Sequence, residues 1–450
     1  MTERPRRRKP DRARRLAFDV LRSVHADGAY ANLALAALLA ERGLTGRDAA
    51  FATELVAGTC RLQGTYDAVV AAAAGRALGT FQPAVLDLLR LGTHQVLSLR
   101  VPVHAAVAAM VDLAAATVGE RVTGLTNAVL RRVAAHDLAE WLELLTAGLE
   151  PRDALALRTA HPRWVVDAFA DLLPPEELEP ALAADNRNPQ VALAVRPGLA
   201  EVADLVAAGA EPGRWSPYAV RWSGPPTELP SVREGRVGVQ DEGSQLVAWG
   251  LARAEAPAGP WLDLCAGPGG KSALLAGLAA AAGDRLVAVE PSAHRAELVA
   301  AGARAYPTGQ RPTVLRADGT RPPWTPGRFA RVLVDVPCTG LGALRRRPEA
   351  RWRRTAADVE QLHPLQTALL ASALDAAAPG AVVAYVTCSP HRRETVDVVE
   401  EVLATRPEVS RLPAAALLPE LSDAALGDFL QLWPYRHGTD AMFAAYLRVG

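Results

Sequence analysis

The chain has 450 residues, and its 49 basic side chains are balanced by 49 acidic ones, so overall charge does not indicate a polyanionic partner. Half of the residues are hydrophobic, and roughly 150 residues per domain predicts about three domains, each with its own core. Four cysteines exclude a disulfide-rich secreted scaffold, and no uncharged apolar run approaches the roughly 20 residues that span a bilayer. We expect a soluble, cytoplasmic, multidomain protein with no membrane partner.

Arginines are concentrated in two segments. The first 15 residues read MTERPRRRKPDRARR, and a second cluster contains Arg345, Arg346, Arg347 and Arg351. Both segments can neutralise phosphate groups, although a solvated tail and a solvated loop are the alternative explanation. Lysine occurs only at positions 9 and 271, so Lys271, inside a glycine-rich loop, is a candidate for a specific role.

The first domain, residues 1–145, is predicted to be all helix. Its apolar residues repeat with the spacing of one helix face, as at Ala17, Val20, Leu21 and Val24. Thr45 with Asp48 resembles a capping box at a helix start. Cys60 is expected to be a small buried residue without a functional role.

The rest of the chain divides into two further predicted domains. Residues 146–250 mix short helices with strand-like runs such as VALAVRP, which predicts a small α+β domain. From 251 to 450, strand-like runs alternate with helical segments, a pattern typical of a parallel sheet with helices on both faces. The strands are expected at 261–265, 285–290, 313–318, 331–336 and 381–388. The two closing strands, FLQLWP and AMFAAYLRV, predict an antiparallel hairpin at the edge of the sheet.

The loop CAGPGGK, residues 265–271, follows the first of these strands and precedes a helix. Its glycines let the backbone approach a ligand, and the amides at the helix N-terminus favour negatively charged groups. Glu290 ends the next strand 20 residues after Gly270, where an acidic residue can accept hydrogen bonds from ribose hydroxyls. The pair predicts a nucleoside cofactor, with a dinucleotide still possible. The spacing of a phosphate-binding P-loop is absent.

Cys265, Cys338 and Cys388 all lie at the ends of strand-like runs. Ligands of doubly wound sheets bind at the carboxyl ends of the strands, so these thiols should converge on one crevice. Asp318 and Asp335 end two more strands of this sheet, although a turn is the commoner role of a lone aspartate there. No C-x-x-C pair is present, so we expect no metal site.

Two thiols beside a nucleoside cofactor suit the methylation of cytosine at carbon 5. That carbon is a weak nucleophile until a thiolate adds to carbon 6 and generates an enamine, which can attack an electrophilic methyl group. A second group must then remove the proton from carbon 5 before the thiol is expelled. Asp335 can orient the cytosine by contacting the Watson–Crick edge of the base. The spacing does not decide which of Cys338 and Cys388 performs which task.

Three segments, LDLCAGPGGK, VLVDVPCTGLGALRRRPEARW and YVTCSP, resemble signature segments of the RNA cytosine-5 methyltransferases related to Sun and the nucleolar NOP proteins. This resemblance covers about residues 235–450. The helical region, with NAVLRRV at 127–133, resembles the NusB-type RNA-binding domain. The combination is similar to the bacterial Sun/RsmB-type enzymes that methylate 16S ribosomal RNA.

The resemblance implies an all-α NusB-like domain, a small α+β linker domain and a Rossmann-like class I methyltransferase domain that uses S-adenosylmethionine. It implies that Cys388 is the nucleophile, that Cys338 assists product release and that Asp335 lies at the reaction centre; we add Lys271 to this catalytic set. Gly267 stands where many relatives have alanine, and Glu290 where many have aspartate. The expected cofactor-binding residues are Cys265, Ala266, Gly267, Pro268, Gly269, Gly270, Lys271, Glu290, Asp318 and Asp335.

The resemblance also implies an RNA partner, either 16S rRNA or a small-subunit assembly intermediate. A stacked base cannot be attacked at carbon 6, so the target must lie in a loop or be flipped out, with arginines on the flanking phosphates. Methylation of transfer RNA and a non-catalytic, antitermination-like RNA-binding regulator stay open. We expect a monomer. Because the arginine cluster follows the Pro-Cys loop, we assign the RNA contacts to Arg345, Arg346, Arg347 and Arg351.

Overall fold

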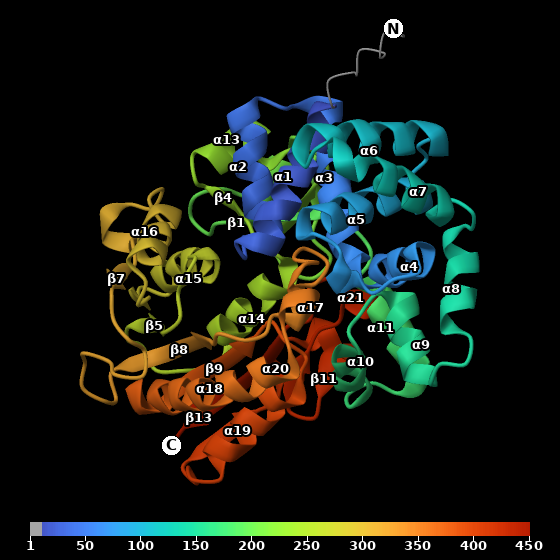
Figure 1. Ribbon diagram of the computed structural model, residues 1–450. Coiled ribbons are helices and arrows are strands. Elements are labelled where there is room, and N and C mark those ends of the chain that lie inside the picture. Colours follow the sequence, from blue (N-terminus) through green and yellow to red (C-terminus); the bar gives the residue numbers. More distant parts are fainter. Residues whose placement is uncertain (1–10) are drawn as a thin grey trace, which may run out of the picture. The chain divides into compact units, whose positions relative to one another are not determined.

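The computed structural model describes residues 11–450, so most of the basic N-terminal tail lies outside the described residues. The chain forms two compact units that interleave along the sequence (Figure 1). Unit 1 contains the described residues up to 167 together with 175–186 and 346–353. Unit 2 contains 168–174, 187–345 and 354–450. The predicted division into three domains stays a prediction.

Unit 1 is helical. Its core contains the apolar face predicted for the first helix, because Ala17, Val20, Leu21 and Val24 are all buried there. Thr45 precedes α3, but its side chain makes no capping hydrogen bond, so the predicted capping box is wrong. Gly46 starts the helix with φ at 56°, which changes the backbone geometry that such a box requires. The helices are α1 (Arg12–Ala26), α2 (Ala31–Arg42), α3 (Gly46–Arg61), α4 (Gln63–Ala74), α5 (Pro83–Leu97), α6 (Val103–Thr117), α7 (Thr123–Val133), α8 (Leu138–Thr146), α9 (Pro151–Thr159), α11 (Pro175–Ala184) and α17 (Ala350–Arg353), with α10 (Arg163–Ala170) crossing into unit 2.

The first part of unit 2 is a small antiparallel sheet with two short helices. Its strand order is β2-β3-β1-β4, and Leu193, Leu205 and Val220 form part of its core. This α+β character agrees with the expectation from the sequence. The elements are β1 (Val191–Val195), α12 (Val202–Ala207), β2 (Glu211–Pro212), β3 (Ala219–Trp222), α13 (Pro230–Arg233) and β4 (Val237–Val239).

The second part of unit 2 is a mixed sheet with helices on both faces. Its order is β11-β12-β13-β9-β8-β5-β6-β7, and β10 also pairs with β13. Strands β5 to β9 run parallel, as the alternating pattern predicts. The strands are β5 (Trp261–Asp263), β6 (Leu286–Val289), β7 (Thr313–Leu315), β8 (Phe329–Asp335), β9 (Ala377–Thr387), β10 (Val409–Leu412), β11 (Ala425–Leu426), β12 (Phe429–Gln431) and β13 (Phe443–Val449).

Neighbouring residues of the central strands face opposite layers of helices. Leu333 and Val382 pack in a core with residues of α14 and α15, whereas Val332 and Val383 pack in a core with residues of α18 and α19. The sheet is therefore covered on both faces. The helices are α14 (Glu242–Arg253), α15 (Gly270–Ala281), α16 (Ala293–Gly302), α18 (Ala356–Ala376), α19 (Val396–Leu403), α20 (Ala414–Leu417) and α21 (Pro434–His437).

The C-terminal strands differ from the expectation in their position. β12 and β13 form the predicted antiparallel pair, but α21 lies between them in the chain, and β13 lies inside the sheet between β12 and β9. The residues of β13 from Phe443 to Leu447 are all buried, which explains why this strand occupies an interior position and not the edge.

Candidate active site

The carboxyl ends of β5, β8 and β9 bring the glycine loop, Asp335 and two of the three strand-end thiols together. Asp335 pairs with Val386 across β8 and β9, so the loops that follow these strands leave the sheet side by side. The Sγ atoms of Cys338 and Cys388 lie 3.4 Å apart. The expected convergence of Cys338 and Cys388 is therefore present in the fold.

Lys271 lies in the first turn of α15 and forms an ion pair with Asp335. The distance between Lys271 Nζ and Asp335 Oδ2 is 2.8 Å. Burial alone would lower the pKa of Lys271, but the charge of Asp335, the hydrogen bond to it and the nearby Cys388 together raise that pKa. Lys271 is therefore a permanent cation next to the Cys388 thiol.

The environment of Cys338 keeps its proton on the sulfur. The pKa of Cys338 is raised well above its usual value, first by the hydrogen bond with Cys388, then by burial and by the negative charges of Cys388, Glu394 and Asp335. The pKa of Cys265 is also raised well above its usual value, first by burial and then by the surrounding carboxylates. Neither thiol resembles an activated nucleophile in this arrangement.

Sequence reasoning did not identify a buried carboxylate that joins the two cysteine loops. Glu394 is fully buried and accepts a 2.8 Å hydrogen bond from the backbone N–H of Thr339, the residue after Cys338. Its sequence HRRE looks like an exposed charged turn, and only the fold shows that this carboxylate lies inside. Gln366 of α18 donates to the same carboxylate at 3.2 Å.

Gly342, which the sequence analysis also did not predict, lies where the chain after Cys338 contacts Cys388 and Ala441. Its N–H donates to the Cys388 carbonyl at 2.8 Å, and its carbonyl accepts from the N–H of Ala441 at 2.9 Å. A Cβ at this position would lie 2.0 Å from the Ala441 carbonyl oxygen, so only glycine fits. A lone glycine in PCTGLG gives no sequence signal for this contact.

The glycine loop and Glu290 lie together. Glu290 is buried at the end of β6 and accepts a 2.9 Å hydrogen bond from the N–H of Ser292. A Cβ on Gly267 would lie 2.1 Å from Glu290 Oε2, so glycine at 267 makes room for the longer acidic side chain. Gly269 has φ at 109°, and a Cβ there would lie 2.8 Å from Val299 Cα. Both glycines are required by close contacts.

Asp263 at the end of β5 is a buried carboxyl that the sequence reasoning also missed. Ser272 Oγ donates to its Oδ2 at 2.6 Å, and the backbone N–H of Cys265 also hydrogen-bonds to this carboxyl. Burial raises the pKa of Asp263 to about 7. Asp263 therefore joins the end of β5 to the start of the glycine loop and to α15.

The other predicted cofactor residues surround this loop. Asp318 is exposed after β7 and accepts hydrogen bonds from the N–H and hydroxyl of Thr320, which is the turn role that a lone aspartate commonly has. Ala266 is buried and its N–H donates to the carbonyl of Val289. A cavity of about 230 Å³ adjoins the loop and is lined by residues including Arg196, Gln240, Pro268, Gly269 and Gly270.

The predicted arginine cluster separates into buried and exposed members. Arg351 is fully buried in unit 1, where it donates to the Ala160 carbonyl at 3.0 Å and to Asn186 Oδ1 at 2.8 Å. Arg345 is buried in unit 2 and donates to the Gly438 carbonyl at 3.0 Å. Burial corrects the prediction that these two side chains contact RNA phosphates. Arg346 and Arg347 are exposed.

Residues Arg346–Arg353, which we call the arginine segment, belong to unit 1 although they follow the Cys338 loop in the chain. Trp352 Nε1 donates to the Cys60 carbonyl at 2.7 Å, and a Cβ on Gly64 would lie 2.3 Å from its ring. Glu349 is buried and accepts from the N–H of Ala31 at 3.2 Å, at the start of α2. The segment is therefore packed against the helices of unit 1 through Glu349, Arg351 and Trp352.

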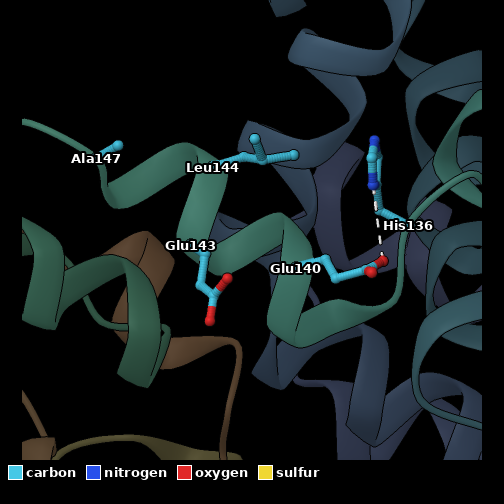
Figure 2. Close-up of a pocket in the computed structure, with 5 residues that line it drawn as sticks. All are labelled: His136, Glu140, Glu143, Leu144 and Ala147. Atoms are coloured by element: carbon cyan, nitrogen blue, oxygen red, sulfur yellow. Dashed lines mark ion pairs between the residues drawn. The ribbon is translucent and has the colours of Figure 1, made fainter.

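An open hollow of about 400 Å³ lies beside α8 in unit 1, and Figure 2 shows its lining. His136 Nδ1 and Glu140 Oε2 are 3.6 Å apart, and Leu144 and Ala147 supply the apolar part. None of the predicted site residues lines this hollow.

No helix within residues 11–450 is long and apolar enough to cross a membrane.

The mixed sheet and its glycine loop define a class I methyltransferase domain, and unit 1 carries a NusB-type helical domain. Residues 251–448 match the family described as 16S rRNA methyltransferase RsmB/F, and residues 11–135 match the NusB family. The chain belongs to the RsmB/F family of rRNA methyltransferases, and this membership implies the use of S-adenosylmethionine.

Two relatives agree with this assignment, and a solved structure agrees with the fold. The Mycobacterium tuberculosis protein Rv1407, provisionally named a methyltransferase, is 52% identical and covers 99% of this chain and 98% of its own length. Ribosomal RNA small subunit methyltransferase B of Pseudomonas putida is 32% identical and covers 82% of this chain and 84% of its own. The crystal structure of PH0851 has a TM-score of 0.81 at 20% identity, covering 98% of this chain and 100% of that chain, which supports the fold.

Proposed function

We propose that the chain forms 5-methylcytosine in 16S rRNA, with S-adenosylmethionine as the methyl donor. The observation that carries this proposal is the 3.4 Å contact between Cys338 Sγ and Cys388 Sγ at the carboxyl ends of two parallel strands. One thiol can add to carbon 6 of a cytosine while the other lies next to the adjacent carbon 5. The name of the Pseudomonas relative and the family description support 16S rRNA as the substrate.

The residues around the glycine loop fit the cofactor. Glu290 ends β6 as a buried carboxylate, which can accept hydrogen bonds from ribose hydroxyls. The amides at the N-terminus of α15 favour a carboxylate group. When bound, S-adenosylmethionine supplies an electrophilic methyl group. Asp318 is retained as an adenine contact.

We assign the nucleophile to Cys388. The ammonium group of Lys271, fixed by Asp335, stabilises negative charge on this sulfur. The raised pKa of Cys338 keeps that residue a thiol, which can donate a hydrogen bond to a Cys388 thiolate. The Lys271 cation near Cys388 and the raised pKa of Cys338 both favour Cys388 as the thiol that adds to carbon 6.

The same contacts account for a change of role during the reaction. Once Cys388 has bonded to carbon 6, its sulfur no longer carries the charge or accepts the hydrogen bond that raise the pKa of Cys338. Cys338 can then release its proton to solvent and remove the proton from carbon 5. The electrons of that C–H bond restore the carbon 5–carbon 6 double bond and expel Cys388 as a thiolate.

We keep two alternatives to this proposal: transfer RNA as the substrate, and a non-catalytic role in RNA binding. Exposed Arg346 and Arg347 are retained as phosphate contacts, and such contacts do not discriminate ribosomal from transfer RNA. A non-catalytic RNA-binding regulator would not need the contact between Cys338 and Cys388, so the geometry favours an enzyme.

The test is methyl transfer from labelled S-adenosylmethionine to purified 16S rRNA, small ribosomal subunits and transfer RNA, followed by bisulfite sequencing. We expect 5-methylcytosine in 16S rRNA or the small subunit with the natural protein and none with Cys388→Ala. Label only in transfer RNA would select that alternative. Absence of 5-methylcytosine from all three RNAs would contradict the enzymatic proposal.

A further inference from the structure

The two loops that carry the thiols are joined through Glu394, a carboxylate that the reaction outlined above does not use. Glu394 follows the Cys388 loop and is fully buried. A buried carboxylate is costly unless hydrogen bonds satisfy it, so its partners indicate what it holds in place. Those partners lie on the Cys338 loop and on α18.

The contacts of Glu394 secure both neighbours of Cys338. Thr339 donates its backbone N–H to Glu394 Oε1 at 2.8 Å and its hydroxyl to Oε2 at 2.5 Å. Gln366 Nε2 donates to Glu394 at 3.2 Å and to the Pro337 carbonyl at 2.8 Å. Glu394 thus binds Thr339, which follows Cys338. Gln366 links Glu394 to Pro337, which precedes Cys338.

We propose that Glu394 is a positioning residue that keeps the Cys338 thiol within reach of Cys388. This inference rests on the proposed function for its biological meaning, but the contacts themselves do not depend on it. Tyr385 OH donates to the Glu394 backbone carbonyl at 2.7 Å, which fixes Glu394 to β9, the strand that ends at Thr387, directly before Cys388. These contacts fix the position of the Cys338 loop relative to β9, and Cys388 directly follows β9 in the chain.

The required accuracy explains why such a residue is useful. Proton removal and thiol expulsion need sulfur atoms within a narrow range of positions, and a misplacement of about 1 Å costs roughly a hundredfold in rate. The loop from Pro337 to Gly340 is irregular, so its position depends on contacts such as those of Glu394.

The test measures the position of the thiols without any methylation. Diamide oxidises two adjacent thiols to a disulfide: both sulfurs lose their protons and together two electrons, and the azo bond of diamide takes up both to become a hydrazine. The rate of the Cys338–Cys388 disulfide is followed by peptide mass spectrometry in the full chain. Glu400→Gln, on the exposed surface of α19, is the matched control.

We expect Glu394→Ala to form this disulfide about tenfold or more slowly than Glu394→Gln does, because both variants lose the charge that raises the pKa of Cys338, but only the alanine variant loses the anchor of the Cys338 loop. Glu394→Gln should stay within about threefold of the natural protein, because its carbonyl can accept from Thr339 N–H and its amide can donate to the Thr339 hydroxyl. Thr339→Val, which keeps only the backbone contact, should be intermediate. If Glu394→Ala does not fold, the test compares the disulfide rates of the other two variants: the proposal requires that Thr339→Val forms the disulfide more slowly than Glu394→Gln does.

A natural rate in Glu394→Ala with an unchanged melting temperature, or equal rates in Glu394→Gln, Thr339→Val and Glu400→Gln, would overturn the proposal. In an RNA assay, Glu394→Ala should accumulate covalent adduct as Cys338→Ala does, while binding cofactor normally. If the natural protein methylates no RNA, the proposed function fails, but the disulfide rates still decide the role of Glu394.

Discussion

The thiols of Cys338 and Cys388 touch each other, yet their neighbours differ. Lys271 lies near Cys388, whereas burial and carboxylates surround Cys338. The sequence shows that both residues are cysteines and predicts that both lie at strand ends, but it does not predict this difference between their environments. It arises from side chains on α15, on the Cys388 loop and at the end of β8.

The first prediction follows from this difference. Cys338→Ala should accumulate a covalent protein–RNA adduct that survives denaturing electrophoresis, because addition by Cys388 proceeds and release is slowed by roughly two to four powers of ten. Cys388→Ala should form no adduct. The reverse pattern on the gel would exchange the two roles.

The second prediction concerns Gly267 and Glu290, which are in close contact. A Cβ on Gly267 would lie 2.1 Å from Glu290 Oε2, so Gly267→Ala should weaken cofactor binding by about 1–3 kcal/mol. Adding Glu290→Asp shortens the acidic side chain and should recover most of this loss. Isothermal titration of S-adenosylmethionine measures all four proteins of the cycle; additive losses in the double variant would argue against coupling.

At the scale of elements, the junction between β5 and α15 depends on Asp263 and Ser272. The pKa of Asp263 is raised by burial to about 7 in the folded protein, against a usual value near 4. The folded state therefore favours the protonated carboxyl. The stability that this group contributes is present below about pH 4 and is lost as the pH rises to about 7.

We expect Asp263→Asn to remove this dependence. In urea titrations of the protein without cofactor, the natural chain should lose more stability between about pH 5 and 7.5 than the variant does, with an upper limit of roughly 3 kcal/mol. Ser272→Ala, which keeps the carboxyl, should retain the dependence. Parallel pH profiles for the natural chain and Asp263→Asn would show that the carboxyl is not perturbed.

The elements themselves were largely predictable where one physical signal dominated. Strands β5 to β9 are short apolar runs, and the turn after β5 is marked by its glycines, so their order and parallel direction follow from the alternation with helices. The sequence did not reveal β10 and β11, because VSRL and AL carry no alternating pattern. Nor could it reveal that Glu394 is buried, since this depends on partners in three other segments.

At the scale of the whole molecule, the arginine segment is the feature that sequence reasoning misread. Its charges suggested an RNA contact, but Trp352, Glu349 and Arg351 bind residues of the helical unit that are remote in sequence. Pairings over such separations leave no local pattern. Only the exposed residues of the cluster stay candidates for RNA.

The last prediction tests where the segment belongs. Trp352→Ala should destabilise unit 1 by about 3 kcal/mol, because it removes an aromatic side chain packed against Gly64 and a hydrogen bond to Cys60. Hydrogen exchange should show faster exchange in α3 and α4, with β8 and β9 unchanged. Arg347→Ala, an exposed neighbour, is the control; equal protection of α3 in both variants would be inconsistent with this assignment.

The interleaving of the two units has a consequence for how such genes recombine. A breakpoint placed between the helical region and the catalytic region would exchange most of the helical core but leave the codons for Arg346–Arg353 behind. The incoming helices would then meet a tryptophan and a glutamate selected for another partner. Functional chimaeras between relatives should therefore require two further crossovers, one on each side of this short stretch, and helical regions should be inherited together with it.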